Sequence, residues 1–198
     1  MTQVSMAALV AGVRSGCLVS FPTDTVPALA VLPERAELIF AAKQRSQNKP
    51  LILMGATSDS LWPFVRGSSD EWQVFQQVAS LYWPGALTLV LPASDRVPPS
   101  MNPAAPTTIG LRVPASALAR SILEQTGPLA TTSANLSGSQ PLQMMAEIAF
   151  QFPDVLTLLP SELESVERGQ GVPSTVAKWM GSGWEILRQG AVKLDSEF

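Results

Sequence analysis

The chain has 198 residues, 46% of them hydrophobic, which is enough to bury a substantial core in one domain and argues against a disordered chain. A formal charge of −3 excludes a global basic field, so any binding of nucleic acid would depend on a local basic patch. Cys17 is the only cysteine, which excludes an intrachain disulfide and a zinc site built on a cysteine cluster. Its apolar surroundings predict a core residue.

The first six residues lack the basic segment and the long apolar run of a signal peptide. No apolar run in the sequence reaches the length of a membrane-spanning helix. We therefore expect a cytoplasmic protein.

Apolar residues in the first half of the chain change between helical and strand-like spacing. Helical spacing predicts helices over residues 4–14 and 36–45. Ser68 and Glu71 form a capping-box pattern that starts a third helix, and Trp83-Pro84-Gly85 ends it. Short apolar runs predict strands over residues 17–21, 50–54 and 87–91.

The second half continues the same alternation after a proline-rich segment, residues 92–106, that predicts a flexible loop. Strands are expected over residues 108–113, 129–132 and 155–159, and helices over 115–125 and 144–150. Residues 174–179 and 184–187 flank a glycine-containing turn and predict a hairpin. The whole pattern predicts an α/β (α+β) fold: a single domain over residues 1–198, with a twisted mixed sheet flanked by helices.

Short polar segments follow the points where several apolar strands end. Such segments expose backbone N–H groups, and their hydroxyl, amide and cationic side chains add donors for phosphate or carboxylate oxygens. The sequence has no histidine, and no glycine-rich run precedes a Lys-Ser or Lys-Thr pair, so the pattern indicates anion binding without a P-loop. The segments are Pro22-Thr23-Asp24-Thr25, Lys43-Gln44-Arg45, Arg112, Thr131-Thr132-Ser133-Ala134-Asn135 and Ser174-Thr175.

Each segment also has a purely structural interpretation. The Thr23 segment fits a turn, the Ser133 segment fits a helix cap, and Lys43 fits a solvated helix end. Arg112 differs, because a cation inside an apolar strand needs a partner from the protein or from a ligand. The five tryptophans fit a core better than a base-stacking platform. The residues alone therefore indicate an anion-binding α/β protein.

Seven motifs in order closely resemble the YrdC-like family of threonylcarbamoyl-AMP synthases over nearly the whole chain. Any one of them alone is a weak signal, and their order makes the resemblance strong. They are Phe21-Pro22-Thr23-Asp24-Thr25-Val26, Lys43-Gln44-Arg45 with Lys49-Pro50-Leu51, Trp83-Pro84-Gly85-Ala86-Leu87-Thr88, Gly110-Leu111-Arg112-Val113-Pro114, Thr132-Ser133-Ala134-Asn135-Leu136-Ser137-Gly138, Ser174-Thr175-Val176 and Leu187-Arg188-Gln189-Gly190.

The resemblance implies a nucleotidyltransferase with a large positively charged cleft. Members of the family convert L-threonine, bicarbonate and ATP, with Mg²⁺ as its counter-ion, into threonylcarbamoyl-adenylate and pyrophosphate. A partner complex then transfers the threonylcarbamoyl group to an adenosine of tRNA, and the family is also associated with double-stranded RNA. No protein nucleophile is needed, because positioning and charge neutralisation drive the reaction.

The resemblance also implies roles for individual residues. Thr25, Arg112, Thr131 and Ser174 are expected to hold threonine, with Arg112 on its carboxylate. The residues expected to hold ATP include Lys43 and Arg45 as the catalytic cations, and no protein metal ligand is expected. The ATP set is Lys43, Arg45, Lys49, Thr108, Ser133, Asn135 and Arg188.

The chain departs from the family where Tyr-Gly-Leu-Gly usually follows Val26. Here the residues are Pro27-Ala28-Leu29-Ala30, so two permissive glycines and an aromatic side chain are lost. Met54 replaces a histidine that lines the threonine pocket in some members, and an acidic segment, residues 162–171, replaces the usual Asp-Gly-Gly. These departures are expected to affect the threonine site more than the fold. The alternative function is a paralogue that keeps the cleft as an RNA- or nucleotide-binding module for ribosomes or RNA maturation.

Overall fold

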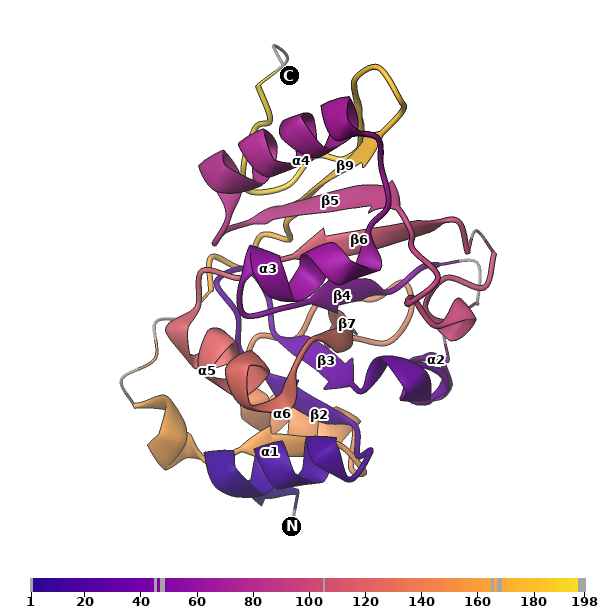
Figure 1. Cartoon of the computed structure of the whole chain (residues 1–198). Coiled ribbons are helices and arrows are strands. Elements are labelled where there is room, and N and C mark those ends of the chain that lie inside the picture. Colours follow the sequence, from indigo (N-terminus) through magenta and orange to yellow (C-terminus); the bar gives the residue numbers. More distant parts are fainter. Residues whose placement is uncertain are drawn as a thin grey trace.

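The computed structural model describes residues 2–44, 46, 49–104, 106–164, 166 and 169–195. Within this part of the chain, ten strands form one mixed sheet (Figure 1). The strands are β1 (Gln3–Val4), β2 (Val19–Phe21), β3 (Ala28–Val31), β4 (Ile52–Met54), β5 (Leu87–Pro92), β6 (Thr108–Arg112), β7 (Leu129–Ser133), β8 (Leu156–Leu158), β9 (Thr175–Trp179) and β10 (Trp184–Arg188). Their order in the sheet is β1-β8-β2-β3-β7-β4-β6-β5-β9-β10.

The sheet is mixed because it contains both parallel and antiparallel strand pairs. β8 pairs in parallel with β1 and β2, β4 with β6, and β5 with β9. β7 is antiparallel to both of its neighbours, β3 and β4, at the centre. The predicted hairpin is present as the antiparallel pair of β9 and β10 at one edge.

Helices flank this sheet. In Figure 1, α3 and α4 lie in front of the upper strands, α1 lies in front of the lower strands, and α6 lies behind them. None of these helices is long and apolar enough to cross a membrane, within the residues that the structure describes. The helices are α1 (Met6–Arg14), α2 (Glu37–Ala42), α3 (Ser58–Leu61), α4 (Ser69–Tyr82), α5 (Ala117–Thr126) and α6 (Met145–Gln151), with 3₁₀ turns η1 (Pro33–Arg35), η2 (Trp62–Phe64), η3 (Pro99–Met101) and η4 (Pro160–Leu163).

The capping box predicted from Ser68 and Glu71 is confirmed at the start of α4. In α4, Ser68 Oγ accepts the Glu71 N–H at 3.3 Å, and Glu71 Oε2 accepts the Ser68 N–H at 2.9 Å. This reciprocal pair satisfies two amide donors that a helix start leaves without an internal partner. The predicted fold class and the predicted strands over residues 50–54, 87–91 and 108–113 are likewise confirmed, with ends that differ by one or two residues.

Three expectations were wrong. Strand β3 falls where no strand was predicted, because it is buried on both faces and lacks the alternation that marks a half-buried strand. The predicted flexible loop contains η3, whose Met101 is fully buried. Cys17 is exposed rather than part of the core, because it lies in the short connection between α1 and β2.

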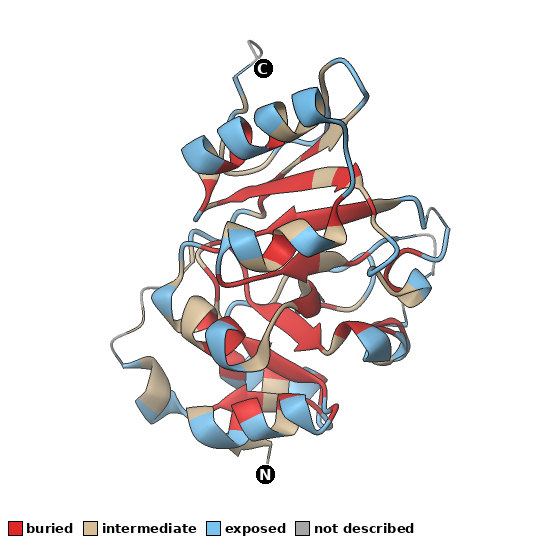
Figure 2. Cartoon of the chain, viewed as in Figure 1, coloured by how far each residue is buried: buried red, intermediate tan, exposed pale blue. Residues whose placement is uncertain are grey.

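The core consists of two buried clusters on the sheet, which Figure 2 shows as buried strands between partly exposed helices. The smaller cluster packs α1 and α5 against β2 and β3. The larger one packs α2, α4 and α6 against side chains of β3, β4, β5 and β6. Phe75 of α4 contacts Trp72, Trp179 and Trp184 at ring-centroid distances of 6.1, 5.6 and 6.3 Å. The structural interpretation of these tryptophans is therefore confirmed.

Candidate functional site

Arg112 lies at the end of β6 and is 4% exposed. Its Nε donates to the Gly85 carbonyl at 3.0 Å, one terminal nitrogen donates to Thr25 Oγ1 at 2.7 Å, and the other donates to Asp24 Oδ1 at 2.8 Å. Burial lowers the pKa of Arg112, the charge of Asp24 opposes this change, and the charge of Arg188 lowers the pKa further. Arg112 thus has the protein partner that a buried cation requires, and a second cation is close enough to repel it.

The loop that carries Thr25 is fixed by its own hydroxyls and by a distant segment. Thr23 Oγ1 lies 3.1 Å from Thr25 Oγ1 and donates to the Val26 carbonyl at 2.8 Å. The Gly171 N–H donates to the Thr25 carbonyl at 2.9 Å. At Gly169 an added Cβ would lie 2.4 Å from the Thr25 carbonyl oxygen, so a glycine is needed for this close approach.

Ser174 precedes β9 and is 3% exposed. Its hydroxyl lies 2.8 Å from Thr88 Oγ1, and its carbonyl accepts from Arg188 Nε at 3.1 Å and from a terminal Arg188 nitrogen at 2.8 Å. The Arg188 side chain remains accessible to solvent, although burial lowers its pKa. The resemblance assigned Arg188 to ATP and Ser174 to threonine, and the structure joins these two residues by hydrogen bonds.

Lys43 caps the end of α2 and is completely buried. Its ammonium donates to the Ser133 carbonyl, to the Asn135 carbonyl at 2.6 Å and to Asn135 Oδ1 at 3.2 Å. Asn135 Oδ1 also accepts from Ser133 Oγ at 2.6 Å. The lysine and the two polar residues that were predicted to bind ATP thus form one hydrogen-bonded group, in which the ammonium holds the turn after β7.

The remaining predicted residues occupy different settings. Thr131 lies inside β7, paired with β3 and β4, and its hydroxyl donates to the Ile52 carbonyl at 3.0 Å. Thr108 begins β6, where Asn102 Nδ2 donates to its carbonyl at 3.1 Å. Lys49 is exposed in the connection before β4. Arg45 lies outside the described residues.

Strand register places four of the polar side chains described above on one face of the sheet: Arg112, Thr131, Thr88 and Arg188. Paired residues in neighbouring strands share a face, and so do residues two apart in one strand. Arg112 and Thr131 meet this condition because Gly110, two residues before Arg112, pairs with Ile52, and Ile52 also pairs with Thr131. Thr88 and Arg188 share a face because both pair with Val176, and Thr88 joins Arg112 because Val90 pairs with Gly110.

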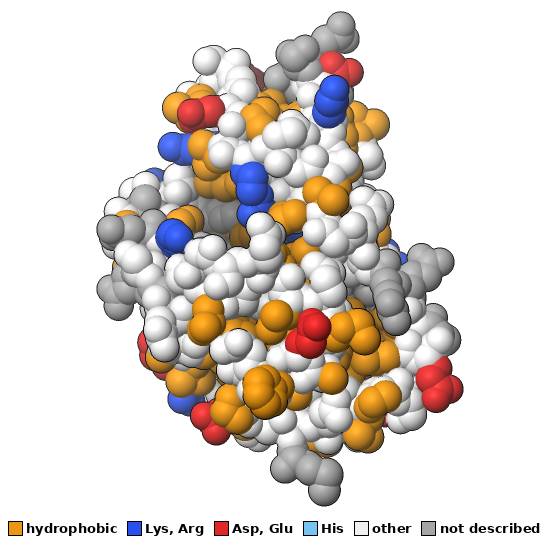
Figure 3. All heavy atoms as spheres, turned by 180° about the vertical axis from the view of Figure 1, so that it is seen from behind, with side chains coloured by type: hydrophobic (Ala, Val, Ile, Leu, Met, Phe, Trp, Pro, Cys, Tyr) orange, Lys and Arg blue, Asp and Glu red, His pale blue; other side chains and the backbone are white. Residues whose placement is uncertain are grey.

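The face opposite α3 and α4 is hollowed, and Lys and Arg side chains gather around the hollow in the upper part of the molecule (Figure 3). The charge of Arg188 disfavours the charge of Arg112, so an anion bound near both guanidinium groups would relieve this repulsion. Of the described residues, no group of three or more His, Cys, Asp or Glu side chains could hold a metal ion. The arrangement can therefore bind a carboxylate or phosphate through side chains and backbone groups.

The residues that differ from the family pattern at Pro27-Ala28-Leu29-Ala30 lie in two different environments, the buried core and the lining of a cavity. Ala28 and Ala30 are buried in the cluster that packs α1 and α5, so their methyl groups lie among apolar side chains. Pro27 lines a cavity of about 530 Å³ together with Thr23 and Met145, and its carbonyl accepts the Ala134 N–H at 2.9 Å. The two alanines therefore contribute to packing, whereas Pro27 borders the Thr23 loop.

Sequence reasoning gave no role to two residues that the structure places in the site. Asp24 forms the ion pair with Arg112, and Thr88 forms the hydroxyl contact with Ser174. Both belong to the motifs quoted above. The signal for Asp24 was available, because an acid three residues after a strand is the simplest partner for a buried arginine.

The fold and this cationic sheet face define an α/β protein with a face that can bind an anionic group. The family model for Sua5, YciO and YrdC proteins, described as "Telomere recombination", matches residues 12–190, and the chain belongs to this family.

Similar proteins agree with this membership. The threonylcarbamoyl-AMP synthase of Pyrococcus abyssi is 33% identical over 187 residues, covering 92% of this chain and 53% of its own length. The chain therefore spans about half the length of that relative. The threonylcarbamoyl-AMP synthase of Vibrio campbellii is 32% identical over 181 residues, covering 89% of this chain and 94% of its own.

Solved structures show the same fold. P. abyssi Sua5 complexed with L-threonine matches with a TM-score of 0.82 and 30% identity, over 93% of this chain and 54% of that chain. E. coli YciO matches with a TM-score of 0.78 over 95% of this chain and 90% of that chain, at 23% identity. The first match provides a relative whose structure contains an amino acid, and the second supports the fold alone.

Proposed function

We propose that this chain forms L-threonylcarbamoyl-adenylate from L-threonine, bicarbonate and ATP, and releases pyrophosphate. The observation that carries the proposal is the cationic pair Arg112 and Arg188, which shares a sheet face with the hydroxyls of Thr88 and Thr131. Synthases at 32–33% identity and the threonine complex of a relative support the same activity. The product would pass to a transferase complex that modifies an adenosine of tRNA.

The threonine carboxylate would bind at Arg112. Asp24, Thr25 and Gly85 fix the guanidinium from three directions, so its remaining N–H donors are held in one orientation before substrate arrives. Asp24 also neutralises part of the charge, which lets the arginine stay buried without a ligand. Ser174 offers its hydroxyl beside this position.

The ATP phosphates would lie toward the turn that Lys43 holds. In this arrangement Lys43 acts through the turn, because its ammonium is bound to the Ser133 and Asn135 carbonyls and fixes the peptide groups that follow β7. Thr108, Arg45 and Lys49 are proposed to complete the ATP site. Mg²⁺ would enter with ATP, since phosphate oxygens and water suit its octahedral coordination.

Arg188 would act at the junction of the two substrates, because it lies on Ser174 and its charge reaches Arg112. The reaction joins the carboxylate of the carbamate to the α-phosphorus and expels pyrophosphate. Negative charge concentrates at this junction, and a fixed guanidinium stabilises it without a protein nucleophile. A chain without histidine can therefore carry out the step.

The test is pyrophosphate release by the purified chain with MgATP and bicarbonate, measured against threonine concentration. We expect release to require threonine, and Arg188→Gln to lower kcat/KM by about tenfold to a hundredfold, the loss typical of one charge-assisted contact. Arg66→Gln, the same change at an exposed arginine, is the matched control. Turnover that is absent at every threonine concentration, or equal in the two variants, would contradict the proposal.

A further inference from the structure

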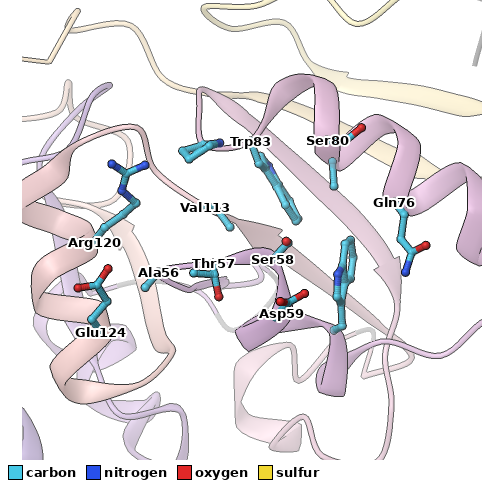
Figure 4. A pocket seen from close by; sticks show the side chains of 13 residues that line it. Ala56, Thr57, Ser58, Asp59, Gln76, Ser80, Trp83, Val113, Arg120 and Glu124 are labelled. Atoms are coloured by element: carbon cyan, nitrogen blue, oxygen red, sulfur yellow. The ribbon is translucent and has the colours of Figure 1, made fainter.

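A second cavity of about 560 Å³ opens between α3, α4 and α5. It does not include any of the residues proposed to bind threonine or ATP among its lining residues. Figure 4 shows Arg120 and Glu124 on one side of this cavity, Asp59 below, and Trp83 with Ser80 on the opposite side. We call it the three-helix cavity.

Charged side chains in the three-helix cavity have no partner within the described part of the protein. Arg120 and Glu124 are one helical turn apart on α5, yet they form no ion pair. Asp59 of α3 likewise makes no side-chain hydrogen bond with a described residue. The cavity therefore presents one guanidinium and two carboxylates that are all available to a ligand.

Beside Ser80, the opposite wall is largely apolar. The rings of Trp62 and Trp83 pack there with centroids 5.8 Å apart and planes tilted by 32°, and Ala79 and Val113 add aliphatic surface. Trp83 Nε1 donates to the Leu87 carbonyl at 2.8 Å, which fixes its ring. A rigid aromatic wall beside a few polar groups is typical of a small-molecule site.

We propose that the three-helix cavity binds a free α-amino acid with a large apolar side chain. The carboxylate would pair with Arg120, the ammonium with Glu124 and Asp59, and the side chain with Trp62 and Trp83. The two carboxylates outnumber the guanidinium, so the cavity disfavours a nucleotide or another polyanion. The site is separate from the proposed reaction and does not depend on it.

The floor of the cavity lies directly next to the bonds of Arg112. Pro84 precedes Gly85, whose carbonyl accepts from Arg112 Nε, and Ala56 follows Gly55, whose N–H donates to the Arg112 carbonyl at 3.1 Å. Val113 follows Arg112 itself. A ligand on this floor would therefore contact the direct sequence neighbours of Gly55, Gly85 and Arg112, the residues whose hydrogen bonds hold Arg112 in place.

The experiment is calorimetric titration of the full chain with L-phenylalanine, in the presence of saturating L-threonine. We expect saturable binding that is lost with N-acetyl-L-phenylalanine, which has no ammonium, and with L-phenylalaninamide, which has no carboxylate. Nuclear magnetic resonance should show shifts of the Gly55 and Gly85 amide signals. Absence of saturable binding at millimolar concentration, or equal binding of all three compounds, would overturn the proposal.

Variants separate this cavity from the candidate substrate site. Arg120→Gln and Glu124→Gln should each weaken L-phenylalanine binding about tenfold or more, because each removes one charge-assisted contact. Arg66→Gln is the control for charge, and Ser174→Ala is the control for the substrate site; neither should change binding. Loss of L-phenylalanine binding in Ser174→Ala with retention in Arg120→Gln would place the ligand elsewhere. Circular dichroism verifies that each variant is folded.

Discussion

The buried ammonium of Lys43 offers a sharp test of how the turn after β7 is held. The change Lys43→Met keeps an unbranched side chain of similar length and removes the charge. Its three acceptors, two carbonyls and Asn135 Oδ1, then lose their shared donor. The side-chain oxygen still accepts from Ser133 Oγ, and the Ser133 carbonyl still accepts the Asn135 N–H at 3.1 Å, so the Asn135 carbonyl carries most of the loss.

The magnitude follows from the three acceptors of the ammonium. The Asn135 carbonyl, left without a partner, costs about 1–3 kcal/mol, and each of the two acceptors that keep another donor loses one hydrogen bond at about 0.5–1.5 kcal/mol, which gives about 2–6 kcal/mol in all. Removing a buried charge recovers part of this cost, because a lysine ammonium is expensive to desolvate. We expect a net loss of about 3 kcal/mol in the free energy of unfolding, or about 6–12 °C in Tm for a domain of this size.

Urea and thermal unfolding followed by circular dichroism measure the effect. The matched control is Lys193→Met, the same substitution at an exposed lysine, which should remain within about 0.5 kcal/mol of the wild type. A Lys43→Met protein as stable as the control would refute the reasoning. It would show that the ammonium does not hold the Ser133 and Asn135 carbonyls in solution.

Two further predictions concern a helix start and a close approach. The Ser68 N–H lowers the pKa of the Glu71 carboxyl, so wild type should be more stable than Glu71→Gln at neutral pH, and the difference should disappear as pH falls through the depressed pKa. Gly169→Ala should cost about 1–3 kcal/mol and weaken threonine binding, because its Cβ would lie 2.4 Å from the Thr25 carbonyl oxygen. Gly183→Ala, with open space around it, should have little effect. A pH-independent Glu71→Gln difference, or equal losses for the two alanine variants, would contradict these expectations.

Local signals in the sequence were sufficient to predict those elements whose conformation depends on residues close together in the chain. The capping box of Ser68 and Glu71 set the start of α4, and the glycine turn between residues 179 and 184 set the last hairpin. Such features depend on residues a few positions apart, so a single sequence contains them. Strand β3 was missed because burial on both faces removes the alternating pattern.

The sequence by itself determined the alternation of helices and strands, the lack of histidine chemistry and the polar segments at strand ends. Only the tertiary structure decided which of these segments meet. Thr25 and Arg112 are 87 positions apart, and Lys43 and Asn135 are 92 apart, yet each pair is hydrogen-bonded. The physical reason is that strand order and register place side chains on a common face, and this order depends on packing between distant segments rather than on local preference.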